Sequence, residues 1–228
     1  MDWIECHSFL SRTIKPGSVV LDLGANHAGF STVIADRYGC RCIALEPTPR
    51  LHEGYEPHPL MTYVPAAASG TSGRARFWPM PCDQASTLVA QPEGESIEVE
   101  CLTLRDLITR YQLDRIDLVK MDIEGAEIDF LDSASDEDLG RCDQLTIEFH
   151  DFNGLVDERD VRRVLDRLDS LGFIWARMCP NARGFHDTMI INADHLGLGR
   201  MERIYLKHIA KYHMAGPRVL RRRLGITG

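Results

Sequence analysis

Apolar and polar positions alternate with two different periods along the first part of the chain. Residues 19–23 (VVLDL) form a mostly apolar run that starts with two β-branched residues and ends at Gly24, as expected of a strand buried on both faces of a parallel sheet. Residues 29–38 place apolar side chains at helical spacing, and Gly39 is suited to end that helix. Residues 41–46 have the composition of a second strand. The pattern therefore predicts a strand–helix–strand unit.

Further strands are predicted along the rest of the chain. We expect them at residues 61–64, 116–122, 145–149, 173–178 and 188–192. Between the third and fourth strands, glycines and prolines interrupt the pattern, and short extended pieces at 75–78 and 97–101 indicate a small antiparallel β insertion. The alternation of strands and helices predicts a doubly wound α/β sandwich.

Capping residues mark the helices of the second half. Thr103 is suited to begin a helix that runs through Arg110, and Asp157 to begin a longer one whose apolar residues recur every three or four positions. A last helix is expected at 199–213. A length of 228 residues with 44% hydrophobic side chains fits one domain, residues 1–228, with its core at about 17–193 and a C-terminal helix and basic tail at 199–228.

The net charge and the cysteines of the chain limit the kinds of partner and the cellular compartment that are expected. The formal net charge of -8 argues against a general nucleic-acid binder, so a small molecule is the expected partner. The seven cysteines contain no Cys-x-x-Cys pair, which indicates that most of them are reduced core residues. The first residues lack the pattern of a secretory leader, and no apolar stretch reaches membrane-spanning length. We expect a soluble, cytoplasmic protein without a transmembrane segment.

The segment Asp22-Leu23-Gly24-Ala25-Asn26-His27-Ala28-Gly29 joins the first strand to the first helix. Such a turn exposes backbone N–H groups to a ligand, and its glycines allow a close approach. The dinucleotide fingerprint Gly-x-Gly-x-x-Gly would need glycine where Asn26 stands, which disfavours a nicotinamide cofactor. The loop alone is also compatible with a purely structural tight turn.

Glu46 ends the second strand, where a carboxylate can accept hydrogen bonds from both hydroxyls of a ribose. S-adenosylmethionine (SAM) contains such a ribose and no phosphate. Its methionine amino group needs an acceptor such as Asp22, and its carboxylate needs the N–H groups of the loop. The alternative is that Glu46 is a solvated strand end.

Charged residues also follow the fourth and fifth predicted strands. Lys120, Asp122 and Glu124 surround the end of the fourth strand, and Glu148 and His150 the end of the fifth. Because the carboxyl ends of parallel strands form the ligand crevice, these residues are expected to converge beside the loop and bind the acceptor. His150 is the first candidate for a general base, with Asp122 or Glu148 as its orienting partner or replacement.

Structural interpretations of the same residues remain open. Lys120 is equally suited to an ion pair with Glu124 or Glu127, and Glu127 by itself is expected to be solvated. Asp122, Glu148 and His150 have the ligand types of a divalent-cation site, although their spacing does not require one. His186 and Asp187 are interpreted as an edge loop.

Three motifs in this order, DLGANHAGFS, ALEP and VKMDIEGAE, make the chain resemble the FkbM family of methyltransferases. The resemblance covers about residues 19–192. It implies a class I SAM-dependent methyltransferase fold, Rossmann-like, with a mostly parallel seven-stranded sheet and one antiparallel strand near its edge. It also implies O-methylation of a glycan or a secondary metabolite. By position, the residues expected to contact SAM are Asp22, Gly24, Ala25, Asn26, Gly29 and Glu46, with Ala67 near the adenine.

The sequence leaves two other functions open. A nicotinamide-dependent oxidoreductase is disfavoured by Asn26 and by the lack of a Tyr-x-x-x-Lys pair after the fourth strand. A non-catalytic nucleoside-binding module would share the cofactor loop. The acceptor is expected to contact the loops at 80–94 and 151–157, and the sequence leaves open both a homodimer and a role for the tail arginines, Arg218 and 221–223.

Overall fold

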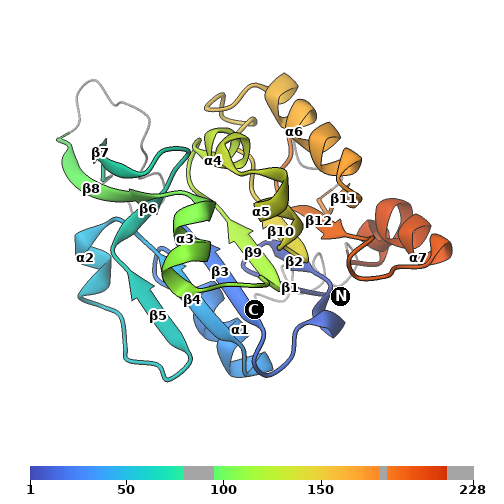
Figure 1. Cartoon of the computed structure of the whole chain (residues 1–228), viewed down its shortest axis with the longest axis horizontal. Coiled ribbons are helices and arrows are strands. Elements are labelled where there is room, and N and C mark those ends of the chain that lie inside the picture. The colour runs from blue at the N-terminus through green and yellow to red at the C-terminus, as the bar shows by residue number, and fades with distance from the viewer. Residues whose placement is uncertain (80–94, 180–183, 215–228) are drawn as a thin grey trace, which may run out of the picture.

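The computed structural model describes residues 1–79, 95–179 and 184–214, and its main feature is a seven-stranded sheet (Figure 1). The strand order is β11-β12-β10-β9-β3-β4-β5. These strands are β3 (Val19–Leu23), β4 (Arg41–Leu45), β5 (Met61–Val64), β9 (Leu118–Met121), β10 (Gln144–Ile147), β11 (Phe173–Arg177) and β12 (Thr188–Asn192). Strand β12 runs antiparallel to both of its neighbours, and the other pairs are parallel. The predicted class I sheet, with one reversed strand near its edge, is confirmed.

Helices cover both faces of this sheet, because alternate residues of its buried strands point to opposite sides. Leu21 of β3 packs into a core with α3 (Leu104–Tyr111), α4 (Glu127–Ser133), α5 (Asp136–Gly140) and α6 (Glu158–Ser170). Val20, the preceding residue, packs into the opposite core with α1 (Gly29–Tyr38). A short helix, α2 (Pro49–His52), follows β4. The sandwich predicted from the alternation is therefore present.

The predicted helix ends agree with the capping groups in the structure. Gly39 ends α1 with a φ of 65°, the left-handed conformation that glycine adopts without strain. Thr103 caps α3 by accepting a hydrogen bond from the Asp106 N–H, and the Asp106 side chain accepts one from the Thr103 N–H in return. Asp157 caps α6 by accepting from the Arg159 N–H. The last helical segment consists of α7 (Arg200–Ile204), one π-helical turn (Tyr205–Ile209) and a further α-helical stretch at 210–214.

The β insertion lies beyond the carboxyl ends of β4 and β5, at the upper left of Figure 1. It is a three-stranded sheet in the order β6-β8-β7, formed by β6 (Ala66–Ala68), β7 (Gly73–Phe77) and β8 (Ile97–Leu102). Strand β7 pairs antiparallel with β8, which confirms the predicted insertion, and β6, which the sequence did not predict, pairs parallel with β8. The three alanines of β6 are all buried, so that strand has no polar alternation to reveal it.

An N-terminal hairpin that the sequence did not predict packs beside the sheet. Its strands are β1 (Asp2–Ile4) and β2 (His7–Phe9), and a 3₁₀ turn (Ser11–Thr13) follows. The two residues of its turn, Glu5 and Cys6, both have positive φ, 44° and 67°. Turns of this kind usually contain Asn or Gly, and the pair Glu5-Cys6 carries no such turn signal. The Asp187 carboxylate anchors the hairpin by accepting from the N–H of Ser8 at 2.8 Å and from its hydroxyl at 2.7 Å.

Two smaller expectations concern the cysteines and the membrane. Cys40, Cys42, Cys101 and Cys142 are buried, as expected of core residues. Within residues 1–79, 95–179 and 184–214, none of the helices is both long enough and apolar enough to cross a membrane. The expected acceptor loop at 80–94 and the tail arginines lie outside the described residues.

Candidate functional site

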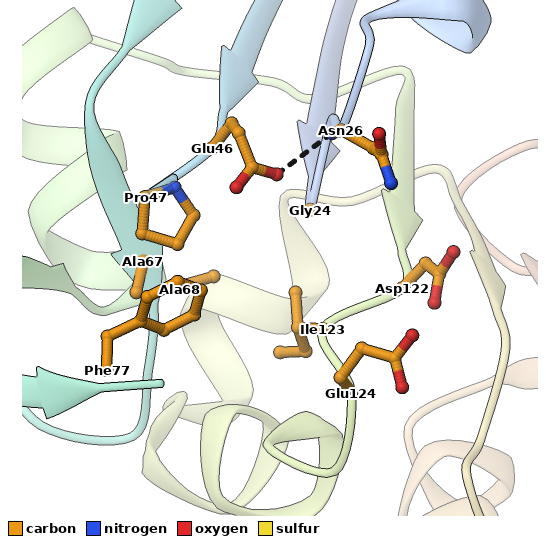
Figure 2. A pocket seen from close by; sticks show the side chains of 10 residues that line it. All are labelled: Gly24, Asn26, Glu46, Pro47, Ala67, Ala68, Phe77, Asp122, Ile123 and Glu124. Carbon is orange, nitrogen blue, oxygen red and sulfur yellow. Dashed lines mark hydrogen bonds between the residues drawn. The ribbon is translucent and has the colours of Figure 1, made fainter. Parts of the chain in front are cut away.

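A pocket opens at the carboxyl ends of β3, β4 and β9, where the sequence places the cofactor loop (Figure 2). It encloses about 550 Å³ of space that is partly open to solvent. The loop, the strand ends and the β insertion all contribute to its lining, which comprises Gly24, Asn26, Glu46, Pro47, Ala67, Ala68, Phe77, Asp122, Ile123 and Glu124. The structure thus brings residues from both predicted sets, cofactor loop and acceptor side, to one pocket.

Glu46 is held firmly at the wall of this pocket. Its side chain is buried, and its carboxylate oxygens accept hydrogen bonds from the N–H of Asn26 at 2.9 Å and from the N–H of Thr48 at 2.9 Å (Figure 2). An ionised carboxylate has about four acceptor positions, so two remain for a ligand. Glu46 is therefore not the solvated strand end that the sequence left open.

The loop conformation explains its residue types. Gly24 has a φ of 79°, and a Cβ at this position would lie 1.8 Å from the backbone oxygen of Asp122, so only glycine fits between the two strand ends. Asn26 has a φ of 49°, a left-handed conformation that asparagine tolerates better than most side chains. A Cβ on Gly29 would meet the Glu5 carboxylate at 2.1 Å. Gly29 therefore makes room for the hairpin.

Asp22 and Lys120 form a buried ion pair behind the loop. The Lys120 ammonium lies 3.1 Å from Asp22 Oδ1 and donates a hydrogen bond to the Gly24 carbonyl oxygen at 2.6 Å, and Asp22 Oδ2 accepts from the Ser31 hydroxyl at 2.6 Å. Burial by itself lowers the pKa of Lys120, but the charges of Asp22, Asp122 and Glu5 and the hydrogen bond to Asp22 together outweigh it, and the pKa is raised. Lys120 therefore pairs with Asp22, and the alternative pairing with Glu124 or Glu127 was wrong.

The placement of Asp22 also changes its expected role. Its side chain is fully buried and does not line the pocket, because the sheet places it beneath the loop. Its predicted direct contact with the amino group of SAM has no support in this geometry. Asp22 instead neutralises Lys120, which in turn holds the loop at Gly24.

His150 lies among three carboxylates on the other side of the pocket mouth. Its ring is 3% exposed. Nε2 is 3.1 Å from Glu124 Oε2 and 3.6 Å from Asp122 Oδ1, and Nδ1 is 2.8 Å from Glu127 Oε1. The expected convergence of the fourth and fifth strand ends is therefore present. We call Asp122, Glu124 and His150 the lip cluster.

Glu127 is fully buried, so the prediction that it is solvated was wrong. It is the first residue of α4, and its side chain folds back under the turn that precedes the helix. Its Oε1 atom accepts from the N–H groups of Ile123 at 3.3 Å and Gly125 at 3.1 Å as well as contacting His150. Glu127 thus joins the turn after β9 to the histidine after β10.

The neighbouring charges alter the acid–base behaviour of this cluster. Burial lowers the pKa of His150, but the hydrogen bond to Glu127 and the charges of Glu127, Glu124 and Asp122 outweigh it and raise the pKa to about 9. Burial raises the pKa of Glu124 to about 7, against the opposing charge of His150. These carboxylates favour the protonated form of His150 over the neutral form that a general base needs.

Glu148 belongs to a neighbouring group of side chains. Its carboxylate lies 2.7 Å from His186 Nδ1, and the His186 ring stacks on Phe152 with 3.8 Å between the ring centroids. Burial and the charge of Asp122 raise the pKa of Glu148. His186, interpreted from the sequence as part of an edge loop, thus lies at the site. Asp187 instead anchors the hairpin.

The hairpin contributes a residue that sequence analysis missed. His7 is 2% exposed, and its ring, Asp122 and Glu148 have potential ligand atoms within 4.8 Å of one another. A second such group consists of the three residues of the lip cluster. The predicted set of Asp122, Glu148 and His150 is therefore divided between two groups that share Asp122. No signal for His7 was available without a prediction of the hairpin.

Comparison with known proteins gives a consistent match. A family model described as a methyltransferase FkbM domain matches residues 22–175. The chain is 27% identical over 182 residues to the 2-O-methyltransferase NoeI of Sinorhizobium fredii, covering 70% of this chain and 74% of that protein. It is 28% identical over 196 residues to the 31-O-demethyl-FK506 methyltransferase FkbM of Streptomyces tacrolimicus, covering 68% and 74%.

A solved structure matches as well, that of methyltransferase FkbM from Methylobacillus flagellatus KT. The sequence identity is 17% and the TM-score 0.46. The match covers 76% of this chain but 43% of the crystallised one, so this chain spans less than half of that protein.

Proposed function

The chain belongs to the FkbM family of methyltransferases, and we propose that it transfers the methyl group of SAM to a hydroxyl oxygen of a small molecule, such as a glycan or a secondary metabolite. Two relatives with 27% and 28% identity carry the names of enzymes that methylate an oxygen. The observation that carries the proposal is the buried Glu46 carboxylate, fixed by two backbone N–H groups at the wall of a pocket that the lip cluster borders.

The residues of the pocket fit the parts of SAM. Glu46 has two acceptor positions left for the ribose hydroxyls. Ala67, Ala68 and Phe77 offer an apolar wall to the adenine. Gly24, Ala25, Asn26 and Gly29 shape the backbone beside the methionine part, with Lys120 bracing that backbone from behind. When bound, SAM supplies an electrophilic methyl carbon on a positively charged sulfur, and its transfer to a hydroxyl leaves S-adenosylhomocysteine and one proton.

The acceptor side of the pocket is rich in hydrogen-bond acceptors. Asp122 and Glu124 line the pocket itself, and Glu148 lies beyond them next to His186. Carboxylates accept hydrogen bonds from hydroxyl groups, so this side favours a polyhydroxylated acceptor. Holding the hydroxyl beside the methyl donor supplies much of the rate enhancement, because a bimolecular encounter becomes an intramolecular one.

The role of His150 differs from that of a general base. Its pKa of about 9 keeps it protonated at neutral pH while its carboxylate neighbours are charged. We assign it a positioning role between the turn that carries Glu124 and the buried Glu127. The cytoplasmic location and the oligomeric state stay predictions from the sequence.

Methyl transfer itself tests the proposal. The purified protein is incubated with SAM carrying a labelled methyl group and with a panel of oligosaccharides and hydroxylated macrolides. We expect label in one acceptor class as a new methyl ether, with S-adenosylhomocysteine formed in equal amount. Binding of SAM without transfer to any hydroxylated acceptor would favour the non-catalytic nucleoside-binding module. Oxidation of an acceptor with NAD would support the rival oxidoreductase.

A further inference from the structure

We propose that the lip cluster, Asp122, Glu124 and His150, is a binding site for one divalent cation. The potential ligand atoms of these residues lie within 4.8 Å of one another. Nε2 of His150 is 3.1 Å from Glu124 Oε2 and 3.6 Å from Asp122 Oδ1. Ligands of an octahedral ion with metal–ligand distances of about 2.1 Å are separated by about 3 Å along each edge, so these atoms need to move little to share an ion.

The second observation is the support behind His150. A histidine that binds a metal commonly donates its other ring N–H to a carboxylate, which fixes the ring and directs the free nitrogen at the ion. His150 shows this arrangement, with Nδ1 2.8 Å from Oε1 of the fully buried Glu127. The Oε2 atom of Glu127 is buried and has no hydrogen-bond partner within the described part of the chain. This pair directs Nε2 toward the two carboxylates of the cluster.

The backbone brings the cluster together at a conformational cost. Glu124 has a φ of 51°, which is unusual for a residue with a long side chain, and Gly125 follows with a φ of 100°. This turn carries the Glu124 carboxylate to the same side of the strand end as that of Asp122 (Figure 2). Strained residues of this kind concentrate at binding sites, where the ligand and the surroundings compensate for the strain.

The negative charge around the lip cluster favours binding of a cation. Asp122 and Glu124 line the pocket, Glu148 is close enough for its charge to act on Glu124, and Glu127 lies directly behind His150. The Lys120 ammonium is bound to Asp22 and the Gly24 carbonyl oxygen and lies 4.0 Å from Asp122 Oδ2, whereas Asp122 Oδ1 is the oxygen next to His150. Two carboxylate oxygens and one imidazole nitrogen form a donor set that suits Mn²⁺ or Mg²⁺, with water or an acceptor hydroxyl completing the coordination.

The site also fits the proposed function, on which its role in catalysis rests. Asp122 and Glu124 line the pocket, so a cation between them would lie next to the place where the methyl donor binds. A cation that binds a hydroxyl oxygen favours loss of its proton, which here passes to water. A cation bound there would take the place of the Nε2 proton of His150, and it would activate the acceptor without a histidine acting as the base.

Binding of Mn²⁺ to the full chain tests the site directly. The protein is stripped of metal with EDTA, dialysed and titrated with MnCl₂, and free Mn²⁺ is measured by electron paramagnetic resonance. We expect one Mn²⁺ per chain, competition by Mg²⁺, and at least a tenfold loss of affinity in Glu124→Gln and in His150→Gln. Glu137→Gln, which changes an exposed carboxylate on α5, serves as the matched control and keeps the affinity.

Three results would overturn the assignment. In the first result, the wild-type chain binds no Mn²⁺. In the second, Glu124→Gln binds Mn²⁺ as tightly as the wild type does. In the third result, His7→Gln and Glu148→Gln lose Mn²⁺ binding while Glu124→Gln keeps it, which would show that the ion binds to the group of His7, Asp122 and Glu148 instead. Retained binding of S-adenosylhomocysteine shows that each variant is folded. Mn²⁺ binding without methyl transfer leaves the site standing and contradicts the proposed function. If Mn²⁺ binds in the titration but transfer is equally fast in EDTA, the site stands and its role in methyl transfer is contradicted.

Discussion

The Lys120 ammonium lies 2.6 Å from the Gly24 carbonyl oxygen and so ties the end of β9 to the loop after β3. The same nitrogen is 3.1 Å from Asp22. The lysine of the VKMDIEGAE motif therefore supports the loop after β3, while Asp122 and Glu124 of the same motif line the pocket. One short motif thus serves both halves of the pocket, which explains how two segments 96 residues apart act together.

Replacement of Lys120 tests this support. Lys120→Met leaves Asp22 buried without its cation, and breaking a buried pair in this way costs about 3–5 kcal/mol. We expect a decrease of that size in the free energy of unfolding, measured by urea denaturation. The control is Lys207→Met, because Lys207 is partly exposed and its ion pair with Asp169 is worth at most about 1 kcal/mol. Equal stabilities of the two variants would show that the buried pair is unimportant.

Glu46 is expected to set the affinity for the adenosyl group. Glu46→Gln removes the charge that would bind the ribose, and hydrogen bonds to charged groups are worth about 1.5–3 kcal/mol, so affinity for S-adenosylhomocysteine should fall by about tenfold or more. Calorimetry measures the change. Glu53→Gln alters an exposed acid after α2 and should leave the affinity unchanged. An unaltered affinity in Glu46→Gln contradicts the placement of the ribose.

Gly24 is predicted to tolerate no side chain. A Cβ would lie 1.8 Å from the backbone oxygen of Asp122, so Gly24→Ala must displace either the loop or the strand end. We expect loss of S-adenosylhomocysteine binding and a lower melting temperature. Gly140→Ala is the matched control, since a Cβ there meets nothing within 4 Å and alanine favours a helix. Wild-type binding by Gly24→Ala would mean that the strand ends approach less closely than described.

The fourth prediction concerns Asp187, which anchors the N-terminal hairpin. Asp187→Ala leaves the Ser8 N–H and hydroxyl buried without their acceptor, which costs about 1–3 kcal/mol. Amide hydrogen exchange in residues 2–9 should become faster. Asp194→Ala removes an exposed carboxylate that pairs with Arg203 and should leave that exchange unchanged. If exchange in the hairpin does not change in Asp187→Ala, other contacts hold it in place.

Most of the sheet follows from local sequence patterns. The runs at 19–23, 61–64 and 188–192 agree with β3, β5 and β12 residue for residue, because apolar runs between turn residues are a local signal. The strand predicted at 116–122 is shorter, Leu118–Met121, with Ile116 forming one isolated bridge to Cys142. Strand ends depend on their neighbours, which a local pattern does not contain.

The sequence was enough to predict where the site lies but not which of its side chains pair with one another. Because parallel strand ends meet at one edge, the sequence indicates that Glu46, Asp122 and His150 converge there, and they do. The burial of Glu127 and the pairing of Lys120 with Asp22 depend on distances across the sheet. His7 reaches the site through a turn with no glycine or asparagine. These features needed the three-dimensional arrangement.

Calorimetric titration of the purified chain with S-adenosylhomocysteine, beside a parallel titration with NAD, tests the central claim that the pocket at Glu46 binds SAM. We predict that one molecule of S-adenosylhomocysteine binds per chain and that NAD gives no binding heat. Binding of NAD with no binding of S-adenosylhomocysteine or SAM would contradict it.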